Sequence, residues 1–189
     1  GRIEEPNAGQ GYSGDDQKAG GNGYIPISLQ YVEYTATAAR DASIAGGDPK
    51  EPFTNRSYKG KTVKAYNYDD LLLVKDTKSA MGSKPVIVVV NCGRPFVPSE
   101  IEPLADAMLL TFHVTQQAVL DIISGKHEPS ALLPMDMPLN MQVVETQMED
   151  VSHDFECYTD AAQHTYRFGF GMNFQGVIND ARVEKYAHK

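Results

Sequence analysis

Chemically reactive side chains follow directly on the most apolar stretch of this sequence. Residues 85–90 read Pro-Val-Ile-Val-Val-Val and run into Asn91-Cys92-Gly93-Arg94-Pro95. An unbroken β-branched run that ends in glycine and proline predicts a strand buried on both faces of a parallel sheet. Active surfaces in such sheets lie beyond the carboxyl ends of the strands, so Cys92 and Arg94 are expected beside any pocket. A nucleophilic role for Cys92 would need a lowered pKa, and a small buried thiol is the simpler prediction.

Two other side chains have the chemistry of proton donors or acceptors. Glu51 precedes Phe53 in residues 46–57, a loop too rich in glycine and proline for a regular element. Partial desolvation beside Phe53 would favour the protonated carboxyl that a proton donor needs. His113 follows a second apolar run and is a candidate base. No serine or cysteine partner is identifiable for it, which favours a hydrogen-bonded histidine in the core or at its rim.

The composition narrows the classes of protein to consider. The chain has 189 residues, 41% of them hydrophobic and 22% charged, which is typical of one soluble globular domain. The formal charge is −8 with no cluster of lysine or arginine, so nucleic acid is not an expected partner. No apolar stretch reaches the roughly 20 residues of a membrane span, so no membrane partner is expected. The cysteines and histidines share no ligand spacing, and we expect neither a metal nor a cofactor.

Apolar periodicity and flanking caps predict four regular elements in the second part of the chain. They are a helix over residues 69–81, a strand over 85–90, a strand over 105–112 and a helix over 116–124. Asp69 or Asp70 is expected to cap the first helix, and Gly82 is expected to end it. Thr115 and Gly125 are expected to do the same for the second helix. This alternation predicts an α/β fold with a parallel sheet.

Long loops are predicted for most of the first part of the chain. Glycine-rich residues 1–24 form the first loop and residues 46–57 the second, and residues 25–34 between them suggest one strand. Tyr12 and Tyr24 are rigid amphipathic rings in the first loop, which favours a binding loop, with a flexible edge as the alternative. Near the other end, residues 166–174 alternate aromatic residues with glycine, which predicts a hydrophobic clasp for the C-terminal tail.

Five blocks of the sequence, in the same order, resemble the C-terminal domain of the family 3 glycoside hydrolases, the β-glucosidase and β-xylosidase group. The first block reads Lys84-Pro-Val-Ile-Val-Val-Val-Asn-Cys-Gly-Arg-Pro95, where family members read Lys-Pro-Val-x-Val-Val-x-x-x-Gly-Arg-Pro. The others are residues 105–110, 116–125, 129–134 and 168–172. Each block alone is weak, and their shared order makes the match specific.

The resemblance implies a three-layer α/β sandwich with a mostly parallel sheet, preceded in family members by a (β/α)₈-like barrel. Residues 1–189 are then a single domain of a larger two-domain enzyme. Loops and edge elements are expected over residues 1–68, and the core and C-terminal tail over residues 69–189. The implied partner is the N-terminal barrel domain, and the implied substrate is a β-linked oligosaccharide or an aryl glycoside. A periplasmic or secreted location is implied as well.

The resemblance also implies how the chemistry is divided. Retaining hydrolysis needs an aspartate nucleophile, which family members carry on the barrel, and an acid/base glutamate, commonly on a loop of the second domain. Glu51 is the expected acid/base residue, with Glu4 and Glu5 as the second choice. Without the nucleophile, the chain alone is expected not to hydrolyse glycosides. The residues assigned to substrate binding are Tyr12, Tyr24, Asp48, Asn55 and Arg56.

Other interpretations stay open. Asp48, Asn55 and Arg56 fit an internal network of turns as well as contacts to a sugar. The whole chain fits a non-catalytic carbohydrate-binding or interaction module, or a homodimer in which a partner strand covers an open sheet edge. Residues 113–117 read His-Val-Thr-Gln-Gln where many family members read Pro-Gly-x-Glu. Contacts made there in relatives are therefore not carried over to this chain.

Overall fold

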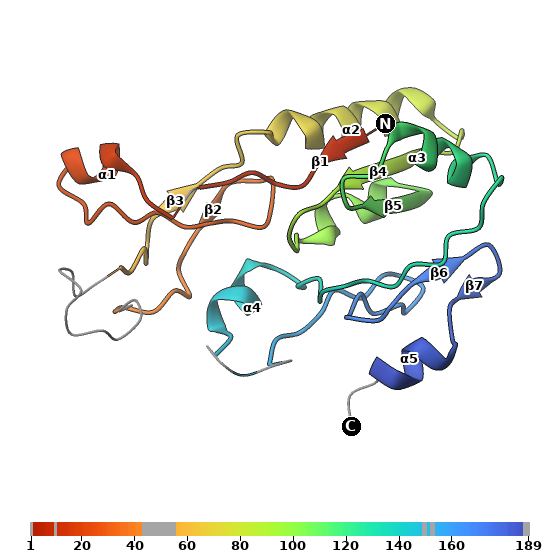
Figure 1. Ribbon diagram of the computed structural model, residues 1–189. Coiled ribbons are helices and arrows are strands. Elements are labelled where there is room, and N and C mark those ends of the chain that lie inside the picture. The colour runs from red at the N-terminus through yellow and green to blue at the C-terminus, as the bar shows by residue number, and fades with distance from the viewer. Residues whose placement is uncertain (1, 10, 43–55, 149–150, 152–153, 187–189) are drawn as a thin grey trace.

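A computed structural model of the chain describes residues 2–9, 11–42, 56–148, 151 and 154–186 (Figure 1). Within these residues the chain is a mixed α/β fold, whose helices and strands alternate along the second part of the sequence. The predicted α/β class with a parallel sheet is therefore confirmed. Among the described helices, none is both long and apolar enough to cross a bilayer.

The central element is a three-stranded parallel sheet in the order β1-β4-β5. Strand β1 spans Arg2–Glu4, β4 spans Ile87–Asn91 and β5 spans Ala107–Thr111. Val89 of β4 is aligned with both Arg2 and Leu109, so β4 is the middle strand. Four of its five residues are buried, which confirms the buried strand predicted from the β-branched run.

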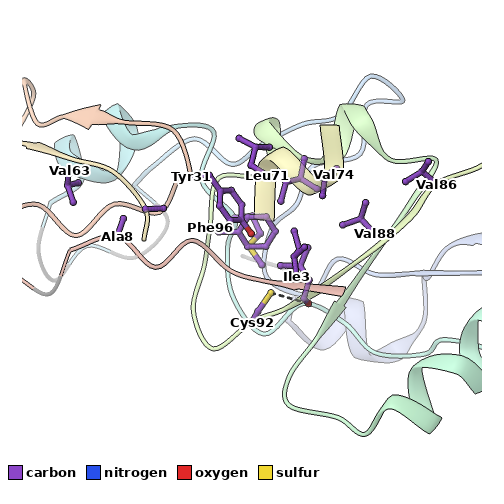
Figure 2. Close-up of a cluster of buried hydrophobic side chains, with 14 residues drawn as sticks. Ile3, Ala8, Tyr31, Val63, Leu71, Val74, Val86, Val88, Cys92 and Phe96 are labelled. Atoms are coloured by element: carbon purple, nitrogen blue, oxygen red, sulfur yellow. Dashed lines mark hydrogen bonds between the residues drawn. The ribbon is translucent and has the colours of Figure 1, made fainter. Parts of the chain in front are cut away.

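Helix α2 (Tyr68–Met81) covers one face of this sheet (Figures 1 and 2). Its buried residues Leu71 and Val74 lie in the same apolar cluster as Ile3 of β1 and Val88 of β4. Burying such side chains contributes about 1.5–3 kcal/mol each. The cluster therefore fixes α2 and the first two strands of the sheet relative to one another.

Both predicted helices of the second part end where the glycines were expected to end them. Gly82 follows α2 with φ 57°, and Gly125 follows α3 (Gln116–Ile123) with φ 75°. Glycine adopts these left-handed conformations without the steric cost that other residues incur. Thr115 caps α3 as predicted, because its hydroxyl accepts the backbone N–H of Ala118 (3.4 Å).

The predicted N-cap of α2 is wrong. Asn67 is the capping residue, and Asp69 and Asp70 lie in the first turn, where negative charge favours the helix N-terminus. The Asn67 amide makes no cap hydrogen bond and instead donates to Glu5 O and to Asp70 Oδ2, both at 3.0 Å. The start of α2 is therefore tied to the end of β1.

Residues 25–34 do not form the predicted strand. Only the last of them lies in a strand, β2 (Tyr34–Thr35), which pairs antiparallel with β3 (Thr62–Val63). The carboxylate of Glu100 instead accepts the backbone N–H groups of Tyr31 (2.5 Å) and of the following residue (3.0 Å). Burial raises the pKa of Glu100. The carboxylate of Glu100 thus accepts two backbone N–H groups that a neighbouring strand would otherwise pair.

Two short elements lie within the first predicted loop. They are β1 and α1 (Gly14–Lys18), and Ser13 caps α1 by accepting the backbone N–H of Asp16 (3.3 Å). The C-terminal clasp has the expected form. The N–H of Leu133 donates to Phe170 O (2.7 Å), and Tyr166 packs against the core cluster. The remaining elements are α4 (Met141–Thr146), β6 (Met172–Asn173), β7 (Gly176–Val177), α5 (Ala181–Tyr186) and the 3₁₀ turns Pro98–Glu100 and Glu102–Leu104.

Candidate functional site

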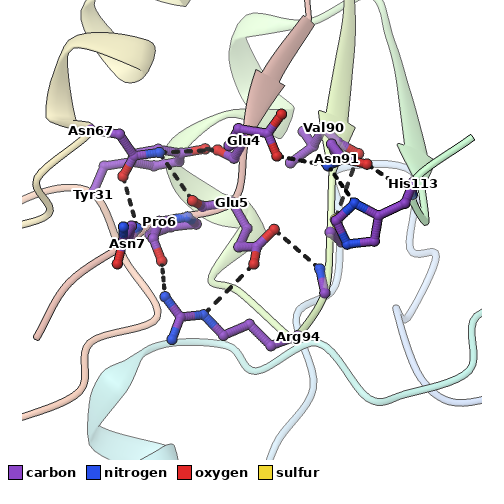
Figure 3. Close-up of polar contacts among 12 residues, drawn as sticks. Glu4, Glu5, Pro6, Asn7, Tyr31, Asn67, Val90, Asn91, Arg94 and His113 are labelled. Atoms are coloured by element: carbon purple, nitrogen blue, oxygen red, sulfur yellow. Dashed lines mark hydrogen bonds and ion pairs between the residues drawn. The ribbon is translucent and has the colours of Figure 1, made fainter. Parts of the chain in front are cut away.

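The carboxyl ends of the three parallel strands meet at one edge of the sheet and carry polar side chains (Figure 3). Strand β1 ends at Glu4, and β4 ends at Asn91. Hydrogen bonds and an ion pair connect these residues to their neighbours. We use the name carboxyl-edge cluster for Glu4, Glu5, Asn91, Arg94 and His113. This edge is where ligands bind in parallel sheets.

Asn91 is the centre of the carboxyl-edge cluster. Its side chain is buried, and its amide oxygen accepts the backbone N–H of His113 (2.9 Å). Because a backbone N–H can only donate, this contact fixes the orientation of the amide. The Nδ2 group of Asn91 therefore donates to Glu4 Oε2 (2.7 Å) and to His113 Nδ1 (3.2 Å). One buried amide thus holds side chains from β1 and from the end of β5 in fixed positions.

Glu5 and Arg94 connect the end of β1 to the turn after β4. Glu5 Oε2 accepts the backbone N–H of Gly93 (3.1 Å), and Glu5 Oε1 lies 3.9 Å from Arg94 Nε. Arg94 also donates to the carbonyl oxygen of Pro6 (2.6 Å). The two side chains are mostly shielded from solvent, so their charges compensate one another more strongly than a surface pair would.

His113 has an uncommon backbone conformation for a residue other than glycine. Its φ of 56° lies in the left-handed region, which few residues other than glycine adopt. The residue is exposed at the rim of the sheet, which is one of its two expected places, and its ring nitrogen Nδ1 is paired with Asn91. Strained conformations of this kind are concentrated at functional positions. The conformation therefore marks His113 as a candidate binding residue.

Cys92 has no nucleophilic role here. The residue is completely buried, and its thiol contacts the carbonyl oxygen of Val90 (3.6 Å). Burial, followed by the negative charges of Glu5 and Glu4, raises its pKa to about 12. The thiol therefore stays protonated at neutral pH, and the predicted small buried thiol is confirmed.

The predicted site residues fall into two sets. Those that lie outside the described residues are Asp48, Glu51 and Asn55. The structure brings the other three together, since the rings of Tyr12 and Tyr24 meet edge to face at 5.8 Å and the Arg56 guanidinium lies 5.5 Å from the centre of the Tyr24 ring. We call these three residues the tyrosine group. Figure 1 shows α1, which follows Tyr12 in the chain, far from β4 and β5, so the tyrosine group is separate from the carboxyl-edge cluster.

Lys61 holds the loop that carries the tyrosine group. Its ammonium group donates to Asp16 Oδ2, Asn22 Oδ1 and Tyr24 O, each at 2.7 Å. The Asp16 carboxylate also accepts the backbone N–H of Gly23 (2.8 Å). The hydrogen bond from Lys61 lowers the pKa of Asp16, so this carboxylate is ionised at neutral pH. The N-terminal loop is therefore organised around a single ammonium group.

Lys61→Met is expected to release the N-terminal loop, because methionine replaces none of the three charge-assisted hydrogen bonds. The measurement is the rate of trypsin cleavage after Lys18 in α1, which should rise several-fold as local opening becomes easier. Lys126→Met removes an exposed lysine ion pair and is the matched control. Equal cleavage rates after Lys18 in the two variants would contradict the prediction.

The contacts that make the carboxyl-edge cluster are not predictable from the sequence. The apolar run predicts Arg94 and Cys92 at a strand end, but no local pattern gives Asn91 a role or pairs His113 with another residue. The signal that existed was positional, because Asn91 and His113 each follow a strand-length apolar run. The end of β1 was not detectable in this way, since that strand has only three residues.

The family model and the relatives that match this chain point to the same protein family. Residues 27–174 match the glycosyl hydrolase family 3 C-terminal domain. The β-glucosidase C of Emericella nidulans is 33% identical over 93 residues, which cover 49% of this chain and 14% of that relative. The probable β-glucosidase C of Aspergillus oryzae is 33% identical over 108 residues, 54% of this chain and 16% of the relative. The putative β-xylosidase of Formosa agariphila is 25% identical over 180 residues, 88% of this chain and 23% of the relative.

The chain spans less than a quarter of the length of these curated relatives. No solved structure matches it significantly. The family match covers well over half of the chain and includes α2, β4, β5 and α3, and therefore two of the three parallel strands. It also includes Asn91, Arg94 and His113 of the carboxyl-edge cluster, whereas β1, Glu4 and Glu5 precede it. This chain therefore belongs to the glycosyl hydrolase family 3 C-terminal domain family.

Proposed function

We propose that this chain is the C-terminal α/β domain of a β-glucosidase-like enzyme, in which it lines part of the sugar site and supplies the acid/base glutamate. The observation that carries the proposal is the carboxyl-edge cluster, found at the ligand-binding edge of a sheet in a member of this family. Carboxylate, amide and guanidinium groups hydrogen-bond sugar hydroxyls well. The names of the relatives favour a β-linked glucoside or xyloside as substrate.

The proposed mechanism divides the chemistry between two segments of protein. The aspartate nucleophile belongs to a barrel domain, and Glu51 protonates the departing oxygen and later activates water. Glu4 and Glu5 fit the acid role less well, because Asn91 holds Glu4 Oε2 and the backbone N–H of Gly93 holds Glu5 Oε2. Their contacts suit positioning and binding better than proton transfer.

The test is to join the chain to the barrel segment of its own protein and to measure hydrolysis of 4-nitrophenyl β-D-glucoside and β-D-xyloside. The joined protein is expected to turn over at least one of them, and the 189-residue chain alone to turn over neither. A lone general acid contributes only about 10²–10⁴-fold, and the nucleophile is also needed. Turnover by the chain alone, or a folded joined protein without activity, would refute the proposal.

A carbohydrate-binding module without catalysis is the second candidate, and the tyrosine group favours it. Tyr12 is 51% exposed, and its ring lies beside that of Tyr24, over which the Arg56 guanidinium is placed. Aromatic faces and guanidinium groups are common contacts for polar ligands. Calorimetry of the 189-residue chain with glucose, xylose and cellobiose separates the two candidates, since tight binding by this chain alone favours the module.

Location and assembly are further parts of the proposal. An enzyme acting on β-linked oligosaccharides is proposed to work in the periplasm or outside the cell. Among the described residues, strands β1 and β5 are the edges of the parallel sheet, and an open edge favours pairing with another segment. The barrel domain is the proposed partner at this surface, with a second copy of the chain as the alternative.

A further inference from the structure

A small open space lies over Gly93, between two side chains of the carboxyl-edge cluster. A Cβ atom placed on Gly93 would lie 3.6 Å from Glu5 Oε1 and 3.7 Å from His113 Nε2. Apart from the chain neighbours of Gly93, no other atom of the described residues would come within 4 Å. Glu5 follows β1 and His113 follows β5, so two different strand ends contribute to the same space (Figure 3).

The hydrogen bonds of Asn91 determine which nitrogen of His113 carries the proton. The Nδ2 group of Asn91 donates to His113 Nδ1, so Nδ1 must present its lone pair. The neutral ring then carries its proton on Nε2. Within the described part of the chain Nε2 makes no hydrogen bond, and its N–H group faces the space over Gly93 as a donor.

Glu5 presents an acceptor to the same space. Its Oε2 atom already accepts the backbone N–H of Gly93, whereas Oε1 faces the space and lies 3.9 Å from Arg94 Nε. The positive charge of Arg94 compensates the charge of the carboxylate at this distance. The space is therefore bordered by one hydrogen-bond donor and one acceptor.

We propose that His113 and Glu5 form a subsite for one hydroxyl group of the bound glucosyl unit. The hydroxyl oxygen accepts the Nε2–H of His113, and the hydroxyl proton is donated to Glu5 Oε1. A hydroxyl group is both donor and acceptor, whereas an ammonium group only donates and a carboxylate only accepts. The inference rests on the proposed function and gives His113 and Glu5 a role in substrate specificity. The left-handed backbone of His113 is explained as the conformation that brings its ring to the space.

His113→Asn, made in the protein joined to its barrel segment, removes the Nε2–H donor and keeps a residue type that tolerates a left-handed backbone. The value of kcat/KM for 4-nitrophenyl β-D-glucoside is expected to fall about fivefold to tenfold, as for one lost hydrogen bond. Four monodeoxy analogues of this substrate each lack one hydroxyl group of the glucosyl unit. The loss in kcat/KM caused by His113→Asn should vanish for the analogue that lacks the bound hydroxyl group and persist for the other three. An equal loss on all four, or no loss on the parent substrate, would overturn the proposal.

Gly93→Ala is a second variant that leaves the histidine in place. Its methyl group meets contacts of 3.6 and 3.7 Å, which are ordinary van der Waals distances, and Gly93 is not among the glycines with a left-handed backbone. The variant is therefore expected to fold and to fill the space. Its loss in kcat/KM should vanish for the same monodeoxy substrate as the loss caused by His113→Asn. If the loss vanishes for a different monodeoxy substrate, or for none of them, the proposal is overturned. His127→Asn changes an exposed histidine outside the cluster and is the matched control.

Nitrogen-15 spectra of histidine in the joined protein distinguish this inference from the proposed function. They are expected to show neutral His113 protonated at Nε2 and unprotonated at Nδ1. The opposite tautomer would overturn the subsite even in an active enzyme. An inactive joined protein would refute the proposed function instead, and the tautomer would still be read from the same spectra.

Discussion

Glu51→Ala, made in the chain joined to its barrel segment, is expected to slow hydrolysis of alkyl β-glucosides by about 10²–10⁴-fold. Alkoxide leaving groups need a proton on the departing oxygen, and the proposed mechanism takes that proton from Glu51. A 2,4-dinitrophenyl group leaves as a stable anion, so its release should be nearly unaffected. The measurement is kcat/KM for the two substrates, compared between wild type and variant.

Glu4→Ala and Glu5→Ala are the matched controls for this dependence on the leaving group. Each removes a carboxylate from the carboxyl-edge cluster, where Glu4 contacts Asn91 and Glu5 contacts Gly93. Loss of a binding contact should lower kcat/KM for both substrates by a similar factor. If Glu51→Ala shows that pattern, Glu51 is not the acid. If Glu4→Ala or Glu5→Ala shows the dependence on the leaving group, the acid role belongs to that residue.

The elements predicted correctly from the sequence are those whose signals are local. Strand β4 is a continuous β-branched run, and its burial on both faces follows from that pattern alone. Helix α3 is bounded by a hydroxyl cap at Thr115 and a glycine at position 125, and both act as predicted. Helix α2 ends at Gly82 for the same reason. Only its start, at Asn67, was placed incorrectly.

The elements that were missed depend on contacts between distant parts of the chain. Residues 25–34 alternate like a strand, but the backbone N–H groups of Tyr31 and Val32 donate to the side chain of Glu100, which no local pattern reveals. Strand β1 has three residues and gains its partner, β4, only in the folded chain. Short strands of this kind have too few positions to show a period of two.

The candidate site was predictable in its location and not in its contacts. The end of the β-branched run predicts that Arg94 lies at the carboxyl edge of the sheet, and the structure agrees, since Arg94 follows the end of β4 and pairs with Glu5. The pairing of Asn91 with His113 depends on the register between β4 and β5, which sequence patterns leave open. The left-handed backbone of His113 had no signal either, because few residues other than glycine adopt this conformation and a single histidine in a sequence does not predict it.

Phe96→Ala is expected to lower the free energy of unfolding by about 3–5 kcal/mol. Phe96 is completely buried in the core cluster with Tyr31 and Leu71, which come from other segments of the chain (Figure 2). Alanine would leave a cavity among residues that already pack against the sheet and α2. The free energy of unfolding of natural domains is only about 5–15 kcal/mol, so the midpoint of urea denaturation should fall sharply. Circular dichroism and tyrosine fluorescence measure it, since the chain has no tryptophan.

Phe174→Ala is the matched control, because Phe174 is 59% exposed and its removal should cost less than about 0.5 kcal/mol. The comparison also bears on the site. Phe96 follows Arg94 by two residues, and Ile3 of the same core cluster directly precedes Glu4. The packing that buries Phe96 therefore also fixes the strand ends that carry the carboxyl-edge cluster. If Phe96→Ala were as stable as Phe174→Ala, this packing could not be what positions those polar side chains.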